Sequence, residues 1–276
     1  MINSPSFLGY TRLGAETTAA VTDQREQFDF GTPGVKEWSP SDPFWQRLEG
    51  PNQYPDLPGS RELVEEYFTS TSAVAKLFVG YVAECLGLPP AISDEFKGNM
   101  DRLKFVKYPP SAPGSQGVGP HKDSSGLFTF LLQDEVGGLQ ALNKEGQWID
   151  VPDLNGCLVV NIQQGFEAIT GGACTATTHR GLASTNKTRY SVPFFLGVRL
   201  DLTLAGVQVA AKHTIERIPS IDNSKKLAVD VPSEFLSSLY SCFGEAHLRN
   251  RNISHPDVGQ LWYLELYAKY SSQVLE

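Results

Sequence analysis

The sequence lacks the features that mark several common protein classes. Its four cysteines, Cys85, Cys157, Cys174 and Cys242, lie far apart and form no CxxC pair. This spacing indicates reduced thiols in an intracellular protein rather than a disulfide framework or a zinc site. No apolar run approaches the roughly 20 residues that cross a bilayer, and the first twenty residues show no secretory signal. GxGxxG and P-loop patterns are also absent. We therefore expect a cytoplasmic protein with neither a membrane nor a bound nucleotide.

Basic residues are also in the minority, with 23 Lys and Arg against 31 Asp and Glu and a net charge of −8. An acidic balance gives no counterion-release drive toward nucleic acid, so we expect a small-molecule partner instead. The chain is 41% hydrophobic and 20% charged over 276 residues, which is typical of a globular protein. It contains only five histidines.

Helical patterns flank the middle of the chain. Frequent prolines predict irregular structure over residues 1–60. Apolar residues at steps of three and four then predict a long amphipathic helix over residues 61–86, with Ser60 as its N-cap. We expect a shorter helix over 93–100 and helical structure from 232 to 276. The predicted apolar face of the long helix consists of Leu63, Tyr67, Val74, Leu77, Phe78, Tyr81, Val82 and Cys85.

The predicted tail contains two helices. The first centres on Phe235, Leu239 and Phe243, and the second follows Ser254-His255. The apolar face of the second helix is predicted to consist of Val258, Leu261, Leu264 and Tyr267.

The middle of the chain is typical of β-structure. Six short runs rich in β-branched and aromatic residues are separated by Gly, Pro, Asn or Asp. Six strands within about a hundred residues indicate an antiparallel barrel or jelly roll rather than alternating βαβ units. The runs are LKFVKY, GLFTFLLQ, GLQALN, QWIDV, CLVVNI and TRYSVPFFLGV.

Two motifs in this region contain candidate metal ligands. PHKDSSG places His121 and Asp123 two residues apart, and an extended chain projects such residues to one face. By itself an HxD pair is more often structural. ATTHRG adds His179, 56 residues after Asp123. Two histidines and one carboxylate on one face of a metal suit non-haem Fe(II), because the opposite positions stay open for a cosubstrate and O₂.

In a third motif, TRYSVPFF, Arg189 lies ten residues after His179. Arg189 and Ser191 share one face of this strand. An arginine fork pairs bidentately with a carboxylate, and a neighbouring hydroxyl can bind the same oxygens. An isolated strand arginine is more often a surface residue, but a metal triad followed by a carboxylate clamp is hard to obtain by chance.

With these motifs the chain resembles the isopenicillin N synthase-like family of 2-oxoglutarate- and Fe(II)-dependent oxygenases, and most closely its filamentous-fungal secondary-metabolism group. The resemblance covers nearly the whole chain. It rests on GPNQYPDLPGSR (50–61), KYPP (107–110), HKDSSGLFTFLLQD (121–134), GGLQALNKEGQWIDVP (137–152), LVVNI (158–162), EAITGG (167–172), TGGACTATTHRG (170–181), TRYSVPFF (188–195) and RNISHPDVGQLWY (251–263).

The resemblance implies a role for each matching residue. His121, Asp123 and His179 match the family's iron ligands, and Arg189 and Ser191 match its RxS clamp for the distal carboxylate of 2-oxoglutarate. Tyr108 matches a tyrosine that often binds the same carboxylate, although a packed strand aromatic is an equal alternative. Lys122 is given no role, because strand alternation points it away from the metal.

The family pattern also implies two differences in this chain. Family members usually have a further segment before the loop SFLGYTRLGAE (6–16), and it supplies a helix and strands to the sheet. Without it we expect either an incomplete start, or an exposed sheet edge or a partner that covers the edge. Gln163 and Gln164 stand where many relatives have Gly-Asp or Gly-Gln. Loss of that glycine predicts a changed backbone approach near the barrel interior.

These observations predict one oxygenase domain over residues 1–276, mainly β with flanking helices, folded as a double-stranded β-helix (jelly-roll) barrel. We expect a loop-rich lid segment (1–60), buttressing helices (61–100), a barrel core with the metal site (101–205) and C-terminal helices (206–276). Phe128, Phe166, Phe195 and Tyr10 are candidate substrate-pocket residues, although strand aromatics are more often core. Lys212 and His213 are expected to be solvated, and His247 and His255 to have structural or surface roles.

The predicted function is oxidation of a small molecule with Fe(II), 2-oxoglutarate and O₂, by hydroxylation, desaturation or ring rearrangement. Three alternatives stay open at this point. One is an isopenicillin N synthase-type oxidase, which needs no 2-oxoglutarate. Another is a catalytically silent binding protein of the same fold. The third is a cupin-like protein with another metal, in which the RxS clamp would have no purpose. The sequence predicts no oligomeric state.

Overall fold

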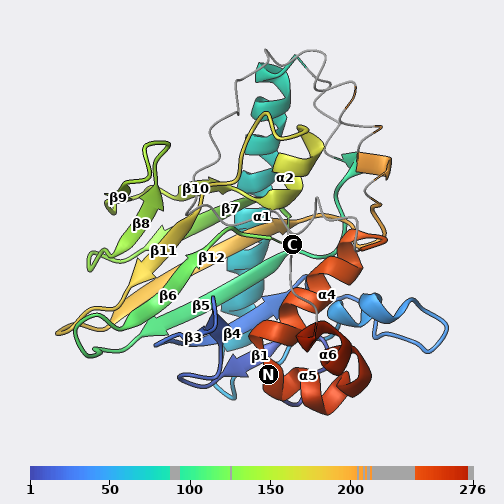
Figure 1. Cartoon of the computed structure of the whole chain (residues 1–276), viewed down its shortest axis with the longest axis horizontal. Coiled ribbons are helices and arrows are strands. Elements are labelled where there is room, and N and C mark those ends of the chain that lie inside the picture. Colours follow the sequence, from blue (N-terminus) through green and yellow to red (C-terminus); the bar gives the residue numbers. More distant parts are fainter. Residues whose placement is uncertain are drawn as a thin grey trace.

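Two antiparallel sheets face each other across the middle of the molecule (Figure 1). The computed structural model describes residues 1–87, 94–124, 126–203, 205–207, 209, 212 and 240–272. The larger sheet has the strand order β1-β4-β5-β12-β7-β10 and the smaller sheet the order β6-β11-β8-β9. Strands of the larger sheet are β1 (Gly9–Thr11), β4 (Glu26–Gly31), β5 (Arg102–Tyr108), β12 (Arg189–Gly197), β7 (Gly126–Gln133) and β10 (Val159–Ile162). Those of the smaller sheet are β6 (Gln116–His121), β11 (His179–Leu182), β8 (Leu139–Leu142) and β9 (Trp148–Asp150).

The two-sheet architecture confirms the predicted jelly roll. All six predicted strands form, as β5, β7, β8, β9, β10 and β12. The two sheets contain four further strands that were not predicted: β1 and β4, which extend the larger sheet, and β6 and β11, which carry the two histidines. These four have little β-branched pattern of their own, so pairing with neighbouring strands determines them.

Strand alternation gives the larger sheet two different faces. On β5, Leu103 and Phe105 belong to the main apolar core, whereas Arg102 and Lys104 line a cavity on the opposite face. Strand β12 repeats this pattern, with Phe194 in the core and its odd-numbered residues on the cavity side. One face of the sheet is therefore apolar and the other carries polar and charged groups.

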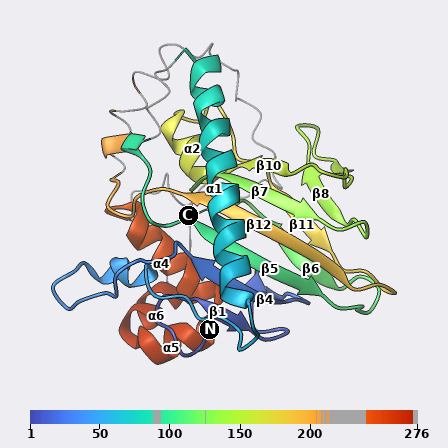
Figure 2. The same ribbon diagram turned by 180° about the vertical axis from the view of Figure 1, so that it is seen from behind.

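Helix α1 (Ser60–Cys85) covers the apolar face. Figure 2 shows it crossing the back of the larger sheet from end to end. Its Phe68 ring meets Phe194 of β12 edge-on at 5.2 Å, and Phe78 meets Phe128 of β7 at 5.3 Å. The helix begins after Gly59, which is in the left-handed region.

The predicted apolar face of α1 is wrong in part. Leu63, Val74, Leu77 and Tyr81 are each at least half exposed. The buried residues are Val64, Phe68, Thr71, Ala75, Val79 and Ala83. Both the predicted and the buried sets of residues recur at steps of three and four, so the spacing fits either face of the helix. The helix turns the face with the smaller residues toward the sheet, because small side chains allow a close approach to the strands.

The predicted helix over 93–100 is also wrong in its described part. Only a short turn forms at residues 94–96, and Lys97 makes an isolated β-bridge with Val198. Gly98 lies against the backbone of Arg199, where an added Cβ would come within 2.5 Å of the Cα atom. This contact requires a glycine, and the pairing of Lys97 with Val198 takes the place of a helix here.

Within residues 240–272, the described part of the C-terminal region, the chain forms three helices, α4 (Phe243–Ser254), α5 (Pro256–Trp262) and α6 (Leu264–Ser271). The single helix predicted after Ser254-His255 is wrong, because the chain breaks at Tyr263, whose ring stacks on Phe7. Leu261 and Leu264 are exposed as a result. The predicted helical positions Phe235 and Leu239 lie outside the described residues.

Residues 1–60 contain more regular structure than expected. Besides β1 and β4 they form a hairpin of β2 (Thr17–Thr18) and β3 (Val21–Thr22), joined by Ala19 and Ala20. The hairpin touches β6 and contributes to the cavity wall. The division of the chain into one domain with four segments stays a prediction.

Candidate active site

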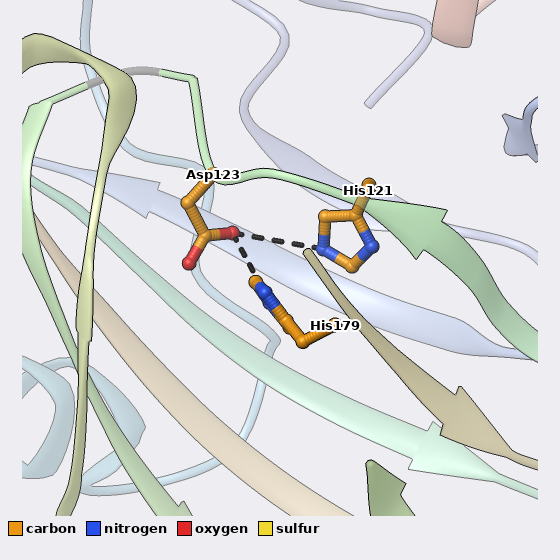
Figure 3. A group of neighbouring side chains, drawn as sticks. All are labelled: His121, Asp123 and His179. Atoms are coloured by element: carbon orange, nitrogen blue, oxygen red, sulfur yellow. Dashed lines mark ion pairs between the residues drawn. The ribbon is translucent and has the colours of Figure 1, made fainter. Parts of the chain in front are cut away.

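His121 and His179 lie opposite each other on neighbouring strands. The last residue of β6 pairs with the first residue of β11, and the two imidazole centroids are 4.4 Å apart. Asp123 follows just beyond β6 and points its carboxylate at both rings (Figure 3). Residues 58 positions apart in the chain are thus brought together by strand pairing.

The three side chains form a compact set of metal-ligating atoms. Oδ1 of Asp123 lies 3.6 Å from Nε2 of His121 and 3.7 Å from Nε2 of His179. Atoms that can ligate a metal all lie within 4.8 Å of one another. Among the described residues this is the one group of three or more His, Cys, Asp or Glu side chains with such spacing. The predicted ligand residues are therefore together.

Hydrogen bonds to neighbouring groups orient all three candidate ligands. Nδ1 of His121 lies 2.7 Å from the carbonyl oxygen of Gly119, and Nδ1 of His179 lies 3.0 Å from that of Thr177. A ring whose Nδ1–H donates to a carbonyl presents a lone pair on Nε2 to a metal. The Thr129 hydroxyl donates to Oδ2 of Asp123 at 2.6 Å, which leaves Oδ1 facing the histidines.

The electrostatic surroundings favour the ligating forms of two of these groups. Burial by itself would raise the pKa of Asp123, but His179, His121 and the Thr129 hydroxyl outweigh burial and hold its pKa well below the ordinary value. Burial lowers the pKa of His179, which Asp123 only partly opposes. A charged carboxylate and a neutral imidazole are the forms that bind a metal.

Arg189 and Ser191 lie on the same face of β12, as predicted. Arg189 is 2% exposed, and its Nη2 atom donates to Oε1 of Gln133 at 3.3 Å. Its Nε and Nη1 atoms have no hydrogen-bond partner, and no carboxylate of the described residues lies within ion-pair distance. A buried guanidinium without a counter-ion is costly, and the carboxylate of a ligand would relieve that cost.

Tyr108 is the cross-strand neighbour of Arg189. Its ring is 4% exposed, and the Arg189 guanidinium lies over it with 4.7 Å between Cζ and the ring centroid. This contact is a cation–π pair. Tyr108 therefore positions the guanidinium by packing against it. Tyr108 also lines the cavity, where a role in ligand binding stays a prediction.

One cavity of about 540 Å³ connects these groups. It is lined by the three candidate ligands, by Arg189 and Ser191, and by residues of the β2–β3 hairpin and of α4. This volume lies within the range of small-molecule sites. The triad and the clamp therefore lie in the wall of the same cavity.

The four predicted pocket aromatics separate into different places. Phe195 lines the cavity. Phe128 and Phe166 pack against each other, with tilted rings, in the core on the α1 side of the sheet, so their prediction as pocket residues is wrong. Tyr10 is 44% exposed, and its hydroxyl donates to Glu26 away from the cavity wall. The face of a strand that lines the cavity is the one that α1 does not cover, and the local sequence pattern does not show which face that is.

Several residues for which the sequence predicted no role in the site lie at the cavity or close to it. His247 is buried and lines the cavity from α4, whereas His255 is 1% exposed with Glu16 at 3.7 Å. Neither is a surface residue. Lys122 is buried with its Nζ 4.0 Å from Glu167 and also lines the cavity, because strand alternation stops at the end of β6. Of the pair predicted to be solvated, Lys212 is exposed, and His213 lies outside the described residues.

The two glutamines that depart from the family pattern are both buried. Nε2 of Gln163 donates to the carbonyl oxygen of Phe128 at 2.7 Å, and Gln164 lines the cavity. The close backbone approach falls on the next residue, Gly165, where an added Cβ would lie 2.4 Å from the carbonyl oxygen of Gly126. The glycine that the approach needs is thus present two positions further along.

Comparison with known proteins decides the family. The model of the 2OG-Fe(II) oxygenase superfamily matches residues 100–198, and that of the N-terminal region of non-haem dioxygenases in morphine synthesis matches residues 1–57. The 2-oxoglutarate-dependent dioxygenase frbJ of a Dothideomycetidae species is 42% identical over 99% of this chain and 77% of its own length. The chain belongs to the 2OG-Fe(II) oxygenase superfamily.

Other relatives agree with this membership. A 2-oxoglutarate-dependent dioxygenase of Gibberella zeae is 36% identical over the whole chain and 77% of its own length. A 2OG-Fe(II) oxygenase family structure from Caulobacter crescentus superposes with a TM-score of 0.62 at 24% identity, covering 89% of this chain and 76% of that one. A full-length Neurospora crassa protein in complex with alpha-KG gives 0.61 at 22% identity, covering 78% and 74%. At these identities the two structures support the fold.

This superfamily member is a dioxygenase whose cofactors are Fe(II) and 2-oxoglutarate, and it takes O₂ and a small-molecule substrate. The residues of the site fit both cofactors, since the His-Asp-His trio offers iron ligands and Arg189 has unpaired donors. In the described part of the chain no helix is long and apolar enough to span a membrane.

Proposed function

We propose that His121, Asp123 and His179 bind the Fe(II) of this oxygenase, and that Arg189 and Ser191 bind the distal carboxylate of its 2-oxoglutarate. The observation that carries this assignment is the joint presence, in one cavity, of three converging ligand atoms and a buried guanidinium without a counter-ion. A facial set of two histidines and a carboxylate leaves positions for a bidentate cosubstrate and O₂.

Each residue around the proposed cofactor site then has a separate role. The carbonyl oxygens of Gly119 and Thr177 fix the two imidazoles, and Thr129 fixes the carboxylate, before the metal arrives. Arg189, packed on Tyr108, provides a preformed fork for a carboxylate. When bound, Fe(II) and 2-oxoglutarate supply the oxidising chemistry, in which 2-oxoglutarate is converted to succinate and CO₂ as O₂ is consumed. The walls of the cavity hold the substrate in a fixed orientation beside that centre.

The alternative of an oxidase that needs no 2-oxoglutarate is disfavoured by the relatives, which are named 2-oxoglutarate-dependent dioxygenases. The reaction on the substrate is proposed to be a hydroxylation, desaturation or ring rearrangement in secondary metabolism. The cytoplasmic location expected from the sequence also stays a prediction, which microscopy of a tagged chain would check.

The test is anaerobic addition of Fe(II) and 2-oxoglutarate to the purified chain, followed by the visible charge-transfer absorption of the chelate. We expect the band in the wild type and none in His121→Ala. Arg189→Ala should weaken 2-oxoglutarate binding by about 1.5–3 kcal/mol, the range for losing a hydrogen bond to a charged group. Arg199→Gln is a matched control, because Arg199 lies just beyond β12 and pairs with Asp201 at the surface.

Three outcomes would contradict the assignment. A folded, metal-loaded wild type without the band would refute the cofactor site. Unchanged iron affinity in the double variant His121→Ala, His179→Ala would refute the ligands. Turnover without any succinate formed from added 2-oxoglutarate would favour the oxidase.

A further inference from the structure

The carboxylate of Asp23 lies between the β2–β3 hairpin and β6, the strand that carries one of the candidate iron ligands. The residue is 0% exposed. Its Oδ2 atom accepts a hydrogen bond from the Thr18 hydroxyl at 2.7 Å and lies 3.0 Å from Nη2 of Arg25. Its Oδ1 atom accepts one from Nε2 of Gln116 at 2.8 Å and a longer one from the backbone nitrogen of Gly119 at 3.4 Å. One oxygen therefore holds the N-terminal segment and the other holds β6.

Gln116, the first residue of β6, adds to this connection. Its Nε2 atom also lies 3.2 Å from the backbone carbonyl oxygens of Thr18 and Val21, at the two sides of the hairpin turn. The side-chain amide packs against Gly119, where an added Cβ would lie 2.7 Å from the carbon, nitrogen and oxygen atoms of that amide. The amide of Gln116 therefore lies between the hairpin and Gly119, and only a glycine at position 119 leaves room for it.

Gly119 in turn orients His121. Its carbonyl oxygen lies 2.7 Å from Nδ1 of the imidazole. The His121 side chain is 29% exposed, compared with 9% for His179. Packing therefore restrains the His121 ring less, and its hydrogen bond to Gly119 matters more. Because Asp23 and Gln116 hold Gly119, the orientation of the imidazole depends on these two side chains as well.

Strand β6 receives limited support from its own sheet. It is an outer strand of the smaller sheet, and the strand that pairs with it is β11. The register of this pair is irregular on both sides of Gly181. At the start of β6, the backbone nitrogen of Gln24 donates to the carbonyl oxygen of Gln116 at 2.8 Å. Residues 18–24 therefore restrain an outer strand that is paired along one edge.

From these contacts we propose that Asp23 and Gln116 are positioning residues of the iron site, which connect the β2–β3 hairpin to the ligand His121. The proposal rests on the proposed function, since it takes His121 as a ligand of Fe(II). Neither Asp23 nor Gln116 is among the residues that line the cavity. Their role is therefore to hold Gly119 and, through its carbonyl group, the imidazole. Groups that orient a metal ligand in this way affect the affinity for the metal.

The connection also extends to the cavity wall. Ala19 and Ala20, which form the turn of the hairpin, line the cavity, and the Thr18 hydroxyl next to them is bound to Asp23. Coupling between two sites is reciprocal in free energy. If the hairpin supports metal binding, metal binding must restrain the hairpin to the same extent. We therefore expect the cofactors to slow backbone hydrogen exchange in residues 17–25.

The first measurement is the Fe(II) affinity of the full chain with 2-oxoglutarate present, by anaerobic competition with a chelator. Asp23→Ala should weaken Fe(II) binding at least fivefold. Glu16→Ala is the matched control, because Glu16 is also buried and also pairs with Nη2 of Arg25 at 3.0 Å. Among the described residues no ion pair or hydrogen bond joins the Glu16 side chain to β6. Its loss should therefore change Fe(II) affinity less than twofold.

A second variant covers the case in which Asp23→Ala fails to fold without its buried carboxylate. Gln116→Met keeps an unbranched side chain of similar length but removes the amide, and it leaves Asp23 paired with Arg25 and Thr18. Gln116→Met should weaken Fe(II) binding at least threefold. Urea unfolding of every variant separates this effect from a general loss of stability.

The second measurement is hydrogen exchange of the full chain by mass spectrometry, with and without Fe(II) and 2-oxoglutarate under anaerobic conditions. In the wild type, exchange in residues 17–25 should slow at least threefold when the cofactors bind. In Gln116→Met this response should be absent even at saturating cofactor concentrations. Residues 44–48 form a short 3₁₀ helix that does not line the cavity, so their exchange should stay unchanged in both proteins.

The outcomes separate this inference from the cofactor assignment. If the folded wild type binds no Fe(II), the proposed function fails, and the positioning role fails with it. If the wild type binds Fe(II), three results overturn the positioning role while the cofactor site stands. The first is wild-type Fe(II) affinity in both Asp23→Ala and Gln116→Met. The second is an equal loss in Asp23→Ala and Glu16→Ala, which would assign the effect to Arg25 rather than to β6. The third is hairpin exchange that does not respond to the cofactors.

Discussion

The hydroxyl of Thr129 donates to Oδ2 of Asp123 at 2.6 Å, and the other carboxylate oxygen faces both histidines. A side chain on β7 thus determines which oxygen of a residue outside the strands is available to the metal. Groups that orient metal ligands in this way usually contribute 10–100-fold to metal affinity.

We therefore expect Thr129→Val to weaken Fe(II) binding by about 10–100-fold, with the fold preserved, because valine matches threonine in shape. Anaerobic competition with a chelator measures this affinity. Thr32→Val is the control, since Thr32 bonds only to a backbone carbonyl near the surface. Equal Fe(II) affinity in Thr129→Val and wild type would show that Asp123 needs no support from β7.

The grouping of the candidate metal ligands could be predicted from the sequence, because their spacing is local or repeats the order known in the family. His121 and Asp123 are two residues apart, and so are Arg189 and Ser191, so extended backbone alone puts each pair on one side. That His179 pairs with His121 is a long-range fact of the β6–β11 ladder. Only the resemblance to a family could supply it in advance.

The side chains that face the cavity could not all be predicted in the same way. Phe128 and Phe195 are both strand aromatics, yet α1 covers the first, and the second faces the cavity. His247 reaches the cavity because α4 packs beside β2 and the larger sheet, and its own sequence neighbourhood is merely helical. Such faces are decided by tertiary packing, which no local pattern records.

The same limit applied to α1, and it leads to a second prediction. Phe68→Ala should destabilise the protein by about 3–5 kcal/mol, because the ring is 4% exposed against Phe194 and its loss leaves a cavity. Leu63→Ala should change stability by no more than about 0.5 kcal/mol, because that side chain is 64% exposed. Urea unfolding measures both. Equal costs at the two positions would show that the face predicted from the sequence is buried after all.

The hairpin at the cavity wall provides a third prediction. Ala19 and Ala20 form its two-residue turn with φ values of 51° and 61°. This left-handed conformation costs an L-residue roughly 1–2 kcal/mol, and hairpin turns of this kind prefer Asn-Gly. The double variant Ala19→Asn, Ala20→Gly should therefore raise the unfolding free energy by about 1–2 kcal/mol.

The matched control for the hairpin is Ala15→Gly, four residues earlier. Ala15 is not among the residues with positive φ, so glycine there should cost about 0.4–1 kcal/mol through the unfolded chain. Thermal unfolding of both variants decides between the two signs. A lower melting temperature in the Asn-Gly variant would mean that the turn is not strained.

A buried carboxyl outside the active site provides a pH-dependent prediction. Asp101 is 4% exposed, and burial raises its pKa to about 6 from an ordinary value of 3.8. Its Oδ1 accepts a hydrogen bond from the backbone nitrogen of Gly197 at 2.8 Å. The folded protein holds this proton more tightly than the unfolded chain does. The contribution of Asp101 to stability is therefore greatest below pH 3.8 and is lost as the pH rises through about 6.

Asp101→Asn keeps an oxygen for the Gly197 bond and removes the charge. A shift of about two pKa units corresponds to about 3 kcal/mol at 1.36 kcal/mol per unit. The variant should therefore be more stable than the wild type at pH 8, with an advantage at least about 1 kcal/mol larger than at pH 5. Urea unfolding at the two pH values measures this difference, and Asp42→Asn, at a half-buried position among the loop prolines, is the control. If the advantage were the same at pH 5 and pH 8, the carboxyl of Asp101 would be ionised in the folded protein throughout, and Lys97 and Arg102 would outweigh its burial.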